Sequence, residues 1–156
     1  MPELKLEVVH TLTEMQQALS VRRAVFIEEQ RVPEELEIDE HDGDPAQVDT
    51  AAHVLGTIDG APVATGRLLL ALDESGHAHI GRVAVLAEHR GRGHGRALML
   101  RLQEVAVERG VRGITLAAQF HAIGFYEKLG YTVRGDVFLD AGIEHRWMDL
   151  DLAKLT

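Results

Sequence analysis

The chain has 156 residues, 46% of them hydrophobic, which predicts one domain over residues 1–156 with a substantial core. Its net charge of −9 disfavours bulk attraction to nucleic acid or to an anionic membrane. No apolar run reaches the roughly 18 residues that a membrane span needs, and the first residues lack a secretory pattern. The absence of cysteine excludes disulfides, thiol nucleophiles and cysteine-ligated metals. We therefore expect a cytoplasmic protein.

The predicted elements follow one another as β-α-β-β-β-α-β-α-β-β. Alternating apolar residues predict a strand over residues 5–11. β-Rich or short apolar runs beside turn signals predict strands over residues 50–58, 61–72, 77–86, 113–119, 131–139 and 143–152. Helical periodicity predicts helices over residues 13–30, 93–109 and 120–129. Thr13 is the expected N-cap of the first helix, while Asp59-Gly60 and Asp140-Ala141-Gly142 are expected hairpin turns. This order indicates an α+β domain with a mixed sheet.

The charges are unevenly distributed along the chain. Residues 28–49 hold ten acidic residues and one basic residue, Arg31. Residues 82–101 instead hold five arginines and one acid, Glu88. One region thus favours a cation and the other an anion.

The glycine-rich segment Arg90-Gly91-Arg92-Gly93-His94-Gly95-Arg96 lies between a predicted strand and a predicted helix. Glycines let the backbone approach a ligand closely, and a helix start offers unpaired N–H groups and a positive dipole end. The segment therefore predicts a cradle for a phosphate or pyrophosphate. It matches neither a Walker A loop, which needs a lysine, nor the dinucleotide fingerprint, whose third glycine would fall at Arg96.

Two other interpretations of this segment stay open. It is compatible with a glycine-rich turn that binds nothing, and with an Arg-Gly tract that binds RNA. The acidic net charge and the 4% aromatic content argue against RNA.

The spacing Arg90-x-x-Gly93-x-Gly95 resembles the acyl-CoA-binding motif of the GNAT superfamily of N-acetyltransferases. The segment from Phe125 to Tyr131 resembles that family's second signature, and the order of elements matches over nearly the whole chain. The segments 25–30, 118–119 and 142–145 resemble the ElaA-like branch. The resemblance implies a mostly antiparallel sheet, flanked by helices, whose two central strands splay apart.

The resemblance also implies which residues bind acetyl-CoA. The pyrophosphate would lie on the backbone of Gly91, Arg92, Gly93, His94, Gly95 and Arg96, with charge added by Arg90 and Arg92. The pantetheine arm would bond to the backbone at Val83, Ala84 and Val85. Gln119 stands where many members carry Asn, and it is expected to contact the same arm.

Tyr126 matches the family's general acid, because a phenol with a pKa of about 10 can reprotonate a departing thiolate. Its other interpretation is a packing residue. Glu28 and Glu29 are candidates for the general base or for a wall that attracts a cationic acceptor, and His145 is a further catalytic candidate. Asp39, Asp42 and His41 are further candidates for the same role, and a solvated acidic loop is the alternative for the whole segment.

No histidine pair has the spacing of a zinc site, and residues 38–49 lack the first and last ligands of a calcium loop, so no metal is expected. The expected function is transfer of the acetyl group of acetyl-CoA to a primary amine of a small molecule or peptide. A non-catalytic acyl-CoA-binding regulatory module is the alternative. The expected partners exclude nucleic acid and membranes and include a possible second copy of the chain.

Overall fold

The protein is described here by a computed structural model that covers residues 2–155. Its seven strands form one sheet in the order β1-β2-β3-β4-β5-β7-β6. The strands are β1 (Leu4–Val8), β2 (Ala51–Ile58), β3 (Ala61–Leu69), β4 (His77–Val85), β5 (Gly113–Gln119), β6 (Thr132–Asp140) and β7 (Ile143–Asp151). Neighbouring strands are antiparallel except β4 and β5, which are parallel. The predicted mixed, mostly antiparallel α+β fold is confirmed.

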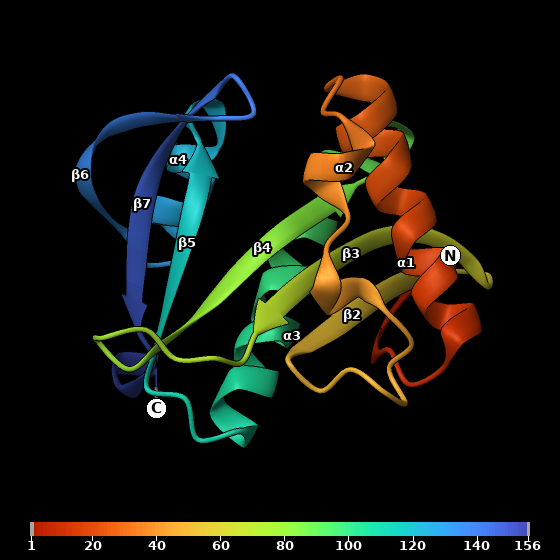
Figure 1. Cartoon of the computed structure of the whole chain (residues 1–156), viewed down its shortest axis with the longest axis horizontal. Helices are drawn as coiled ribbons and strands as arrows, with labels where there is room; N and C mark the ends of the chain where they lie inside the picture. The colour runs from red at the N-terminus through yellow and green to blue at the C-terminus, as the bar shows by residue number, and fades with distance from the viewer. Residues whose placement is uncertain (1, 156) are drawn as a thin grey trace.

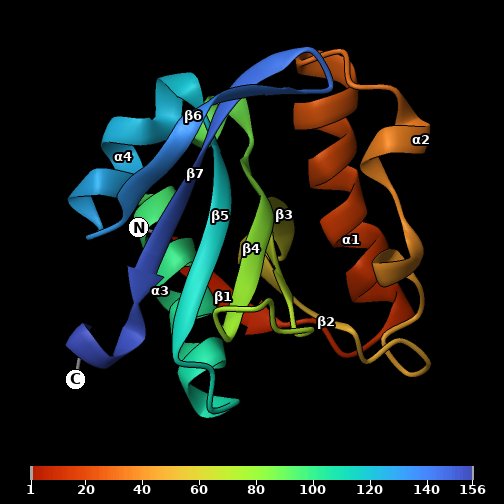
Figure 2. The same cartoon turned by 60° about the vertical axis from the view of Figure 1, so that its left-hand side comes forward.

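Helices cover both faces of the sheet. The α-helices are α1 (Leu12–Arg22), α2 (Glu34–Glu37), α3 (His94–Glu108) and α4 (Ile123–Lys128). Short helical turns are η2 (Glu40–Asp42), η3 (Ala87–His89), η4 (Phe120–Ala122) and η5 (Leu152–Leu155). Figure 2 shows α1 and α2 on one side of the sheet and α3 and α4 on the other. Within residues 2–155, no helix combines the length and the apolar character that crossing a membrane requires.

The first helix starts earlier than predicted. Its N-cap is Thr11, not Thr13, because the Thr11 hydroxyl accepts the Glu14 N–H at 3.1 Å. The Glu14 carboxylate accepts the Thr11 N–H in return, also at 3.1 Å. This reciprocal pair is a capping box, and it satisfies helix-start donors that Thr13 would leave unpaired.

The same helix ends in a wider turn. Residues Arg23–Glu29 form a π-helical segment, η1, and the Gln30 N–H donates to the Val25 carbonyl at 3.0 Å, a five-residue step. Periodicity alone predicts a regular helix to Gln30. π-Helical turns are often found at functional sites, and this one brings Glu29 and Gln30 to the cleft described below.

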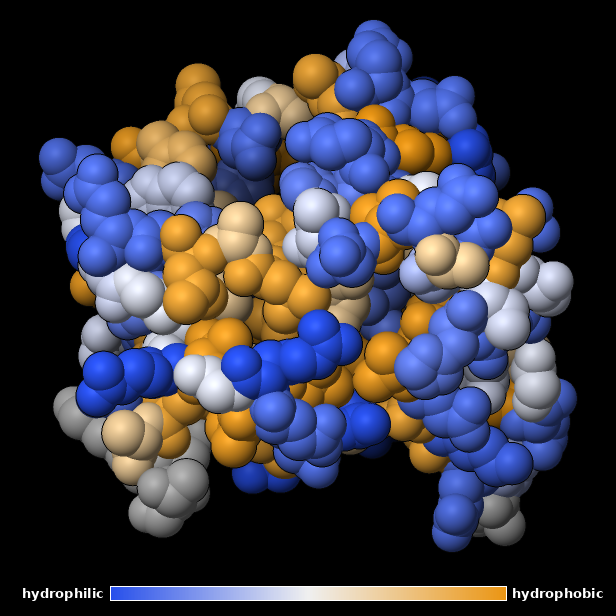
Figure 3. Space-filling view, turned by 60° about the horizontal axis from the view of Figure 1, so that its bottom comes forward, coloured by the Kyte–Doolittle hydropathy of each residue, from blue (hydrophilic) through white to orange (hydrophobic). Residues whose placement is uncertain are grey.

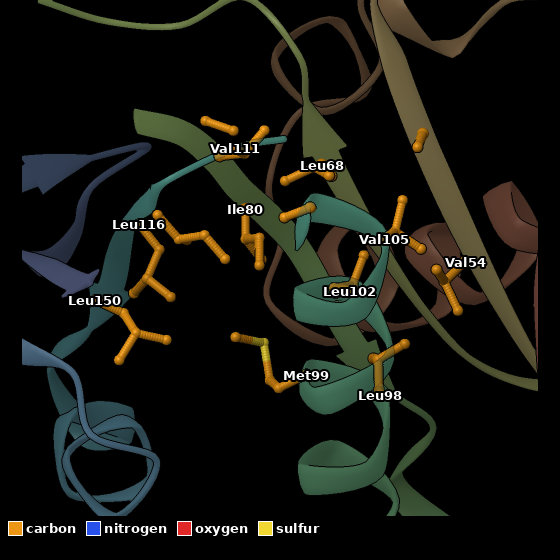
Figure 4. Packing of buried hydrophobic residues seen from close by; sticks show 14 of the residues in the cluster. Val54, Leu68, Ile80, Leu98, Met99, Leu102, Val105, Val111, Leu116 and Leu150 are labelled. Atoms are coloured by element: carbon orange, nitrogen blue, oxygen red, sulfur yellow. The ribbon is translucent and has the colours of Figure 1, made fainter. Parts of the chain in front are cut away.

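The main core lies between α3 and the sheet, as Figure 4 shows for side chains of β3, β4, β5 and α3. The predicted apolar face of α3 is confirmed, since Leu98, Leu102, Val105 and Ala106 are all at most 2% exposed. The helix packs so tightly on β3 that a Cβ at Gly66 would lie 2.6 Å from Leu102 Cδ1. A larger side chain at Gly66 would overpack this contact, and a smaller one at Leu102 would leave a cavity, so both changes would destabilise the fold.

Two-residue turns join two of the hairpins. Asp59-Gly60 has φ of 52° and 79°, and Ala141-Gly142 has φ of 51° and 76°. Positive φ at both positions is the backbone of a type I′ turn, whose twist matches that of paired strands. The first predicted turn is confirmed, and the second is one residue shorter because Asp140 belongs to β6.

The outer surface is mixed in character. In Figure 3, hydrophilic residues cover both sides of the face shown, and hydrophobic residues gather toward its middle. The largest exposed hydrophobic fractions are 70% at Leu139, 57% at Leu36 and 56% at Phe120. Apolar atoms are common on protein surfaces, so these side chains do not by themselves identify a binding partner.

Candidate functional site

The centre of the sheet is split between β4 and β5. The two strands pair only from His77 to His79 and from Gly113 to Thr115. Beyond this point they diverge, as the open V in Figure 1 shows. From Ile80 to Val85 the β5-facing edge of β4 therefore has no partner strand in the described part of the chain, which leaves backbone N–H and C=O groups available to a ligand. The splay predicted from the resemblance is confirmed.

A β-bulge interrupts β4 where it pairs with β3. Arg67 pairs with Gly81 and Thr65 pairs with Ala84, so Arg82 and Val83 together face a single residue of β3. Arg82 has φ of 54°, a left-handed conformation that is uncommon for a non-glycine residue. Its guanidinium is fixed by α2, where it donates to the carbonyls of Leu36 at 3.3 Å and Glu37 at 3.1 Å.

The glycine loop has the backbone that its sequence predicts. Gly91 and Gly93 have φ of 78° and 82°, and Gly93 is the N-cap of α3 with no side chain capping that helix. A Cβ at Gly95 would lie 3.3 Å from Phe125 Cζ, so glycine permits the close approach of α4. The first N–H groups of α3 are therefore open at a positive dipole end, which suits a phosphate.

The splay and the loop border one cleft of about 930 Å³. The expected site residues that line it are Glu29, Val83, Ala84, Val85, Arg90, Gly91, Gly93, His94, Gly95, Arg96, Gln119, Tyr126 and His145. Glu28 and Arg92 are exposed and lie outside the lining. Beside the loop, His89 Nδ1 and His94 Nε2 are buried without a hydrogen-bond partner in the described chain. Such unpaired polar atoms fit a site built for a polar ligand.

Arg90 contacts a carboxylate in this structure. Its Nη1 and Nη2 donate to the Glu29 carboxylate at 2.7 and 2.8 Å, and its Nε donates to the Val85 carbonyl at 2.9 Å. The expected phosphate contact of Arg90 would require this ion pair to open. The hydrogen bond from Arg90 also lowers the pKa of Glu29, which makes that carboxylate a weak base.

The Gln119 amide bridges the cleft. Its Nε2 donates to Gln30 Oε1 at 2.8 Å, and Gln30 Nε2 donates back to Gln119 Oε1 at 3.2 Å. The pair connects the end of η1 to the end of β5. A contact between Gln119 and the pantetheine arm would have to share or replace this bond.

Tyr126 lies on α4 beside two other rings. Its ring centroid is 5.0 Å from that of Phe125 and 5.9 Å from that of Tyr131, both in edge contact. Burial raises the pKa of Tyr126 to about 12. Its hydroxyl makes no hydrogen bond within residues 2–155, so it stays protonated at neutral pH and available to a ligand in the cleft.

His145 lies on β7 opposite Gln119, the last residue of β5. Its Nδ1 is 2.7 Å from the Ile143 carbonyl. Because a carbonyl only accepts, Nδ1 carries the proton of the neutral ring, and Nε2 keeps a lone pair. The ring stacks on Phe138 with centroids 5.8 Å apart and is 7% exposed.

Part of the acidic segment, residues 28–49, is not available to bind a cationic acceptor. Three of its carboxylates turn inward onto three arginines that sequence reasoning did not assign to the site: Arg22 with Glu37 and Asp42, Arg67 with Asp39 and Asp42, and Arg82 with Glu37 and Asp39. Two of them could have been noticed in the sequence, because Arg22 lies on the apolar face of a helix and Arg67 lies in a buried strand. Asp39, Glu40 and His41 lie within 4.8 Å of one another, but Asp39 is bound to Arg67, and we assign this group no ligand role.

Burial and pairing act in opposite directions in this cluster. Burial alone would raise the pKa of Asp42, but two hydrogen bonds from Arg22, at 2.6 and 2.9 Å, lower it below its usual range. Burial also raises the pKa of Glu37, against the attraction of Arg82 and Arg22. Asp42 is thus a structural anion, whereas the Glu37 carboxylate is poised closer to protonation.

Comparison with known proteins identifies the family. Residues 14–131 match the model of the Acetyltransferase (GNAT) family. The chain is 37% identical over 139 residues to the uncharacterized N-acetyltransferase YjcF of Bacillus subtilis (strain 168), covering 88% of this chain and 93% of that one. It is 31% identical over 136 residues to protein ElaA of Escherichia coli (strain K12), covering 86% of each chain.

Solved structures agree with this assignment. The crystal structure of an acyl-CoA N-acyltransferase from Pseudomonas aeruginosa superimposes with a TM-score of 0.80 at 31% identity, covering 94% of this chain and 99% of that one. The crystal structure of Escherichia coli ElaA gives a TM-score of 0.80 at 28% identity with the same coverage. The open V of β4 and β5, the glycine loop at its end and these relatives lead to one conclusion: the chain belongs to the GNAT acetyltransferase family and resembles ElaA.

Proposed function

We propose that the protein transfers the acetyl group of acetyl-CoA directly to a primary amine of a small molecule or peptide. The observation that carries this proposal is the unpaired edge of β4, which runs from Ile80 to Val85 and ends at the glycine loop. Such an edge suits an extended pantetheine arm, which can add hydrogen bonds as a further strand would. The open N–H groups at the start of α3 suit the pyrophosphate.

Tyr126 is the proposed general acid. Acyl transfer expels a thiolate, and a buried phenol that retains its proton at neutral pH can supply that proton as the C–S bond breaks. Its hydroxyl has no competing hydrogen bond within the described chain, and Tyr126 lines the cleft. Of the predicted bases, Glu28 lies outside the cleft and Glu29 is bound to Arg90, whereas His145 retains a lone pair.

Thermal melting with acetyl-CoA tests the binding half of the proposal, with NAD and ATP as controls. A ligand at 100 times its dissociation constant adds about 2.7 kcal/mol. At roughly 2–4 °C per kcal/mol for a domain of this size, the melting temperature should rise by several degrees. If millimolar acetyl-CoA gives no selective rise in melting temperature, the proposed CoA-binding site is wrong.

Release of free thiol with a panel of amines tests the chemical half. We expect turnover with at least one amine, and we expect Tyr126→Phe to reduce kcat while the acetyl-CoA melting shift persists. A melting shift without turnover across the panel would support the alternative, a non-catalytic acyl-CoA-binding module. Equal turnover in Tyr126→Phe would remove Tyr126 from the acid role.

A further inference from the structure

Glu37 is a buried carboxylate in the wall of the cleft with one oxygen unused. The residue is 4% exposed. Its Oε1 accepts from Arg22 Nε at 2.9 Å and lies 3.2 Å from Arg82 Nε. Its Oε2 has no hydrogen-bond partner among the described side chains, and it is not fully sealed from solvent. Glu37 lines the cleft, and Oε2 is the carboxylate oxygen that its arginine partners leave free for a ligand there.

The Glu37 carboxylate of α2 lies beside the part of β4 that the reacting group would reach, provided that the proposed function holds. The glycine loop follows Val85, so an arm that starts at the loop and follows the free edge leads back toward the bulge at Arg82. The Glu37 carboxylate is in direct contact with that bulge. His145 lies opposite Gln119, at the end of β5 away from the point where β4 and β5 pair. Of these two proton acceptors, Glu37 is therefore the one that contacts the bulge.

We propose that Glu37 is the general base, and that its free Oε2 takes a proton from the ammonium group of the acceptor, directly or through one water. The neutral amine nitrogen then forms a bond to the thioester carbon, and the C–S bond breaks. Tyr126 gives its proton to the departing sulfur and recovers one from the nitrogen. The products are the amide and the free thiol of CoA, and Glu37 returns its proton to solvent.

The surroundings of Glu37 suit this task. Five charged groups on four elements face it or its partners: Arg22 of α1, Arg67 of β3, Arg82 of β4, and Asp39 and Asp42 beside and within η2. The three arginines favour the ionised carboxylate, while burial favours the protonated one. A base works best when neither form is strongly preferred. Glu29, in contrast, is held ionised by Arg90.

Glu37→Gln tests the assignment, with Glu35→Gln as the matched control. Both residues lie in α2, but Glu35 is exposed and outside the cleft lining. The glutamine keeps an oxygen for Arg22 and loses the base. At saturating acetyl-CoA we expect Glu37→Gln to lower kcat by about 10²–10⁴-fold and to lose the acidic limb of the pH–rate profile, with the acetyl-CoA melting shift retained. We expect Glu35→Gln to match the wild type.

A second measurement needs no variant at all. The probes are a peptide with a free α-amino group, whose pKa is about 7.7–8.0, and an N-blocked peptide with one lysine, whose pKa is about 10.4. A base on the enzyme predicts the same acidic limb of kcat with both probes. A limb that follows the pKa of each amine would overturn the proposal, even if Glu37→Gln failed to fold.

The outcomes separate this proposal from the proposed function. If the wild type turns over neither probe nor any other amine of the panel, the transferase function fails and the base assignment fails with it. If the wild type and Glu37→Gln turn over a probe equally, only the base assignment fails. Loss of the acidic limb in His145→Gln, with the limb retained in Glu37→Gln, would overturn the assignment in favour of His145.

Discussion

Replacing Asp42 by Asn should destabilise the protein far more than a surface change of the same kind. The Asp42 carboxylate accepts hydrogen bonds from Arg22 at 2.6 and 2.9 Å, from the Asp39 N–H at 2.9 Å and from Arg67 Nη1 at 3.2 Å. Asp42 and Arg22 are 6% and 1% exposed. Breaking a buried ion pair by removing one partner costs about 3–5 kcal/mol. Arg22 keeps its bond to Glu37, so we expect the lower end, about 3 kcal/mol.

This loss is a large share of the roughly 5–15 kcal/mol that stabilises a typical domain. At roughly 2–4 °C per kcal/mol, the melting temperature of Asp42→Asn should fall by about 6–12 °C. Urea unfolding followed by circular dichroism measures the same loss in free energy. Asp49→Asn is the control, because Asp49 is exposed in the same acidic segment and its side chain makes no hydrogen bond or ion pair within the described chain. Equal stability of the two variants would refute the reasoning.

The pH dependence gives an independent check with a defined sign. Arg22 holds the pKa of folded Asp42 below its usual value of about 3.9. The stability that this pair contributes is therefore present above pH 4 and is lost as the pH falls below it. In Asp42→Asn that part of the acid dependence should disappear. A variant that lost stability with acid as steeply as the wild type would show that other groups dominate.

Three further changes have expected outcomes. Gly93→Ala forces a side chain onto φ of 82° and should weaken acetyl-CoA binding in titration calorimetry, whereas Gly124→Ala, a helical position with open space and no positive φ, should leave it unchanged. Glu29→Gln should change the free energy of unfolding by less than about 1 kcal/mol, since both partners of its ion pair with Arg90 are 42% exposed. Burial lowers the pKa of His53, so protonation of this ring opposes folding as the pH falls below about 6.5. His53→Gln should therefore reduce the loss of melting temperature between pH 7 and pH 5.

Much of the fold could be predicted because its signals are local. The Asp59-Gly60 turn, the apolar face of α3 and the glycine loop each depend on a few neighbouring residues whose conformational preferences decide the backbone. The splay and the expected acyl-CoA cosubstrate had no local signal, and both were inferred only from the resemblance of Arg90-x-x-Gly93-x-Gly95 to a family motif. Periodicity predicted the order of elements but no pairing between β4 and β5.

Errors at the first helix show the limit of local signals. Thr11 and Thr13 are both good caps, and the choice between them depends on which one Glu14 can reach. The π-helical turn from Arg23 to Glu29 leaves no mark in the apolar pattern. Its wider step is instead associated with tertiary contacts at its end, where Gln30 meets Gln119 across the cleft.

The sequence by itself determined the family, the glycine loop and the order of strands along the chain, because these follow from short segments read in isolation. Only the tertiary structure decided which charges are available. Residues far apart in the chain meet in the folded protein: Arg22, Arg67 and Arg82 neutralise three acids, and Arg90 occupies Glu29. A carboxylate's reactivity depends on its burial and on its partners, and both are set by packing between elements. That is why Glu37, one of ten acids in a single segment, emerges as the candidate base only once the fold is known.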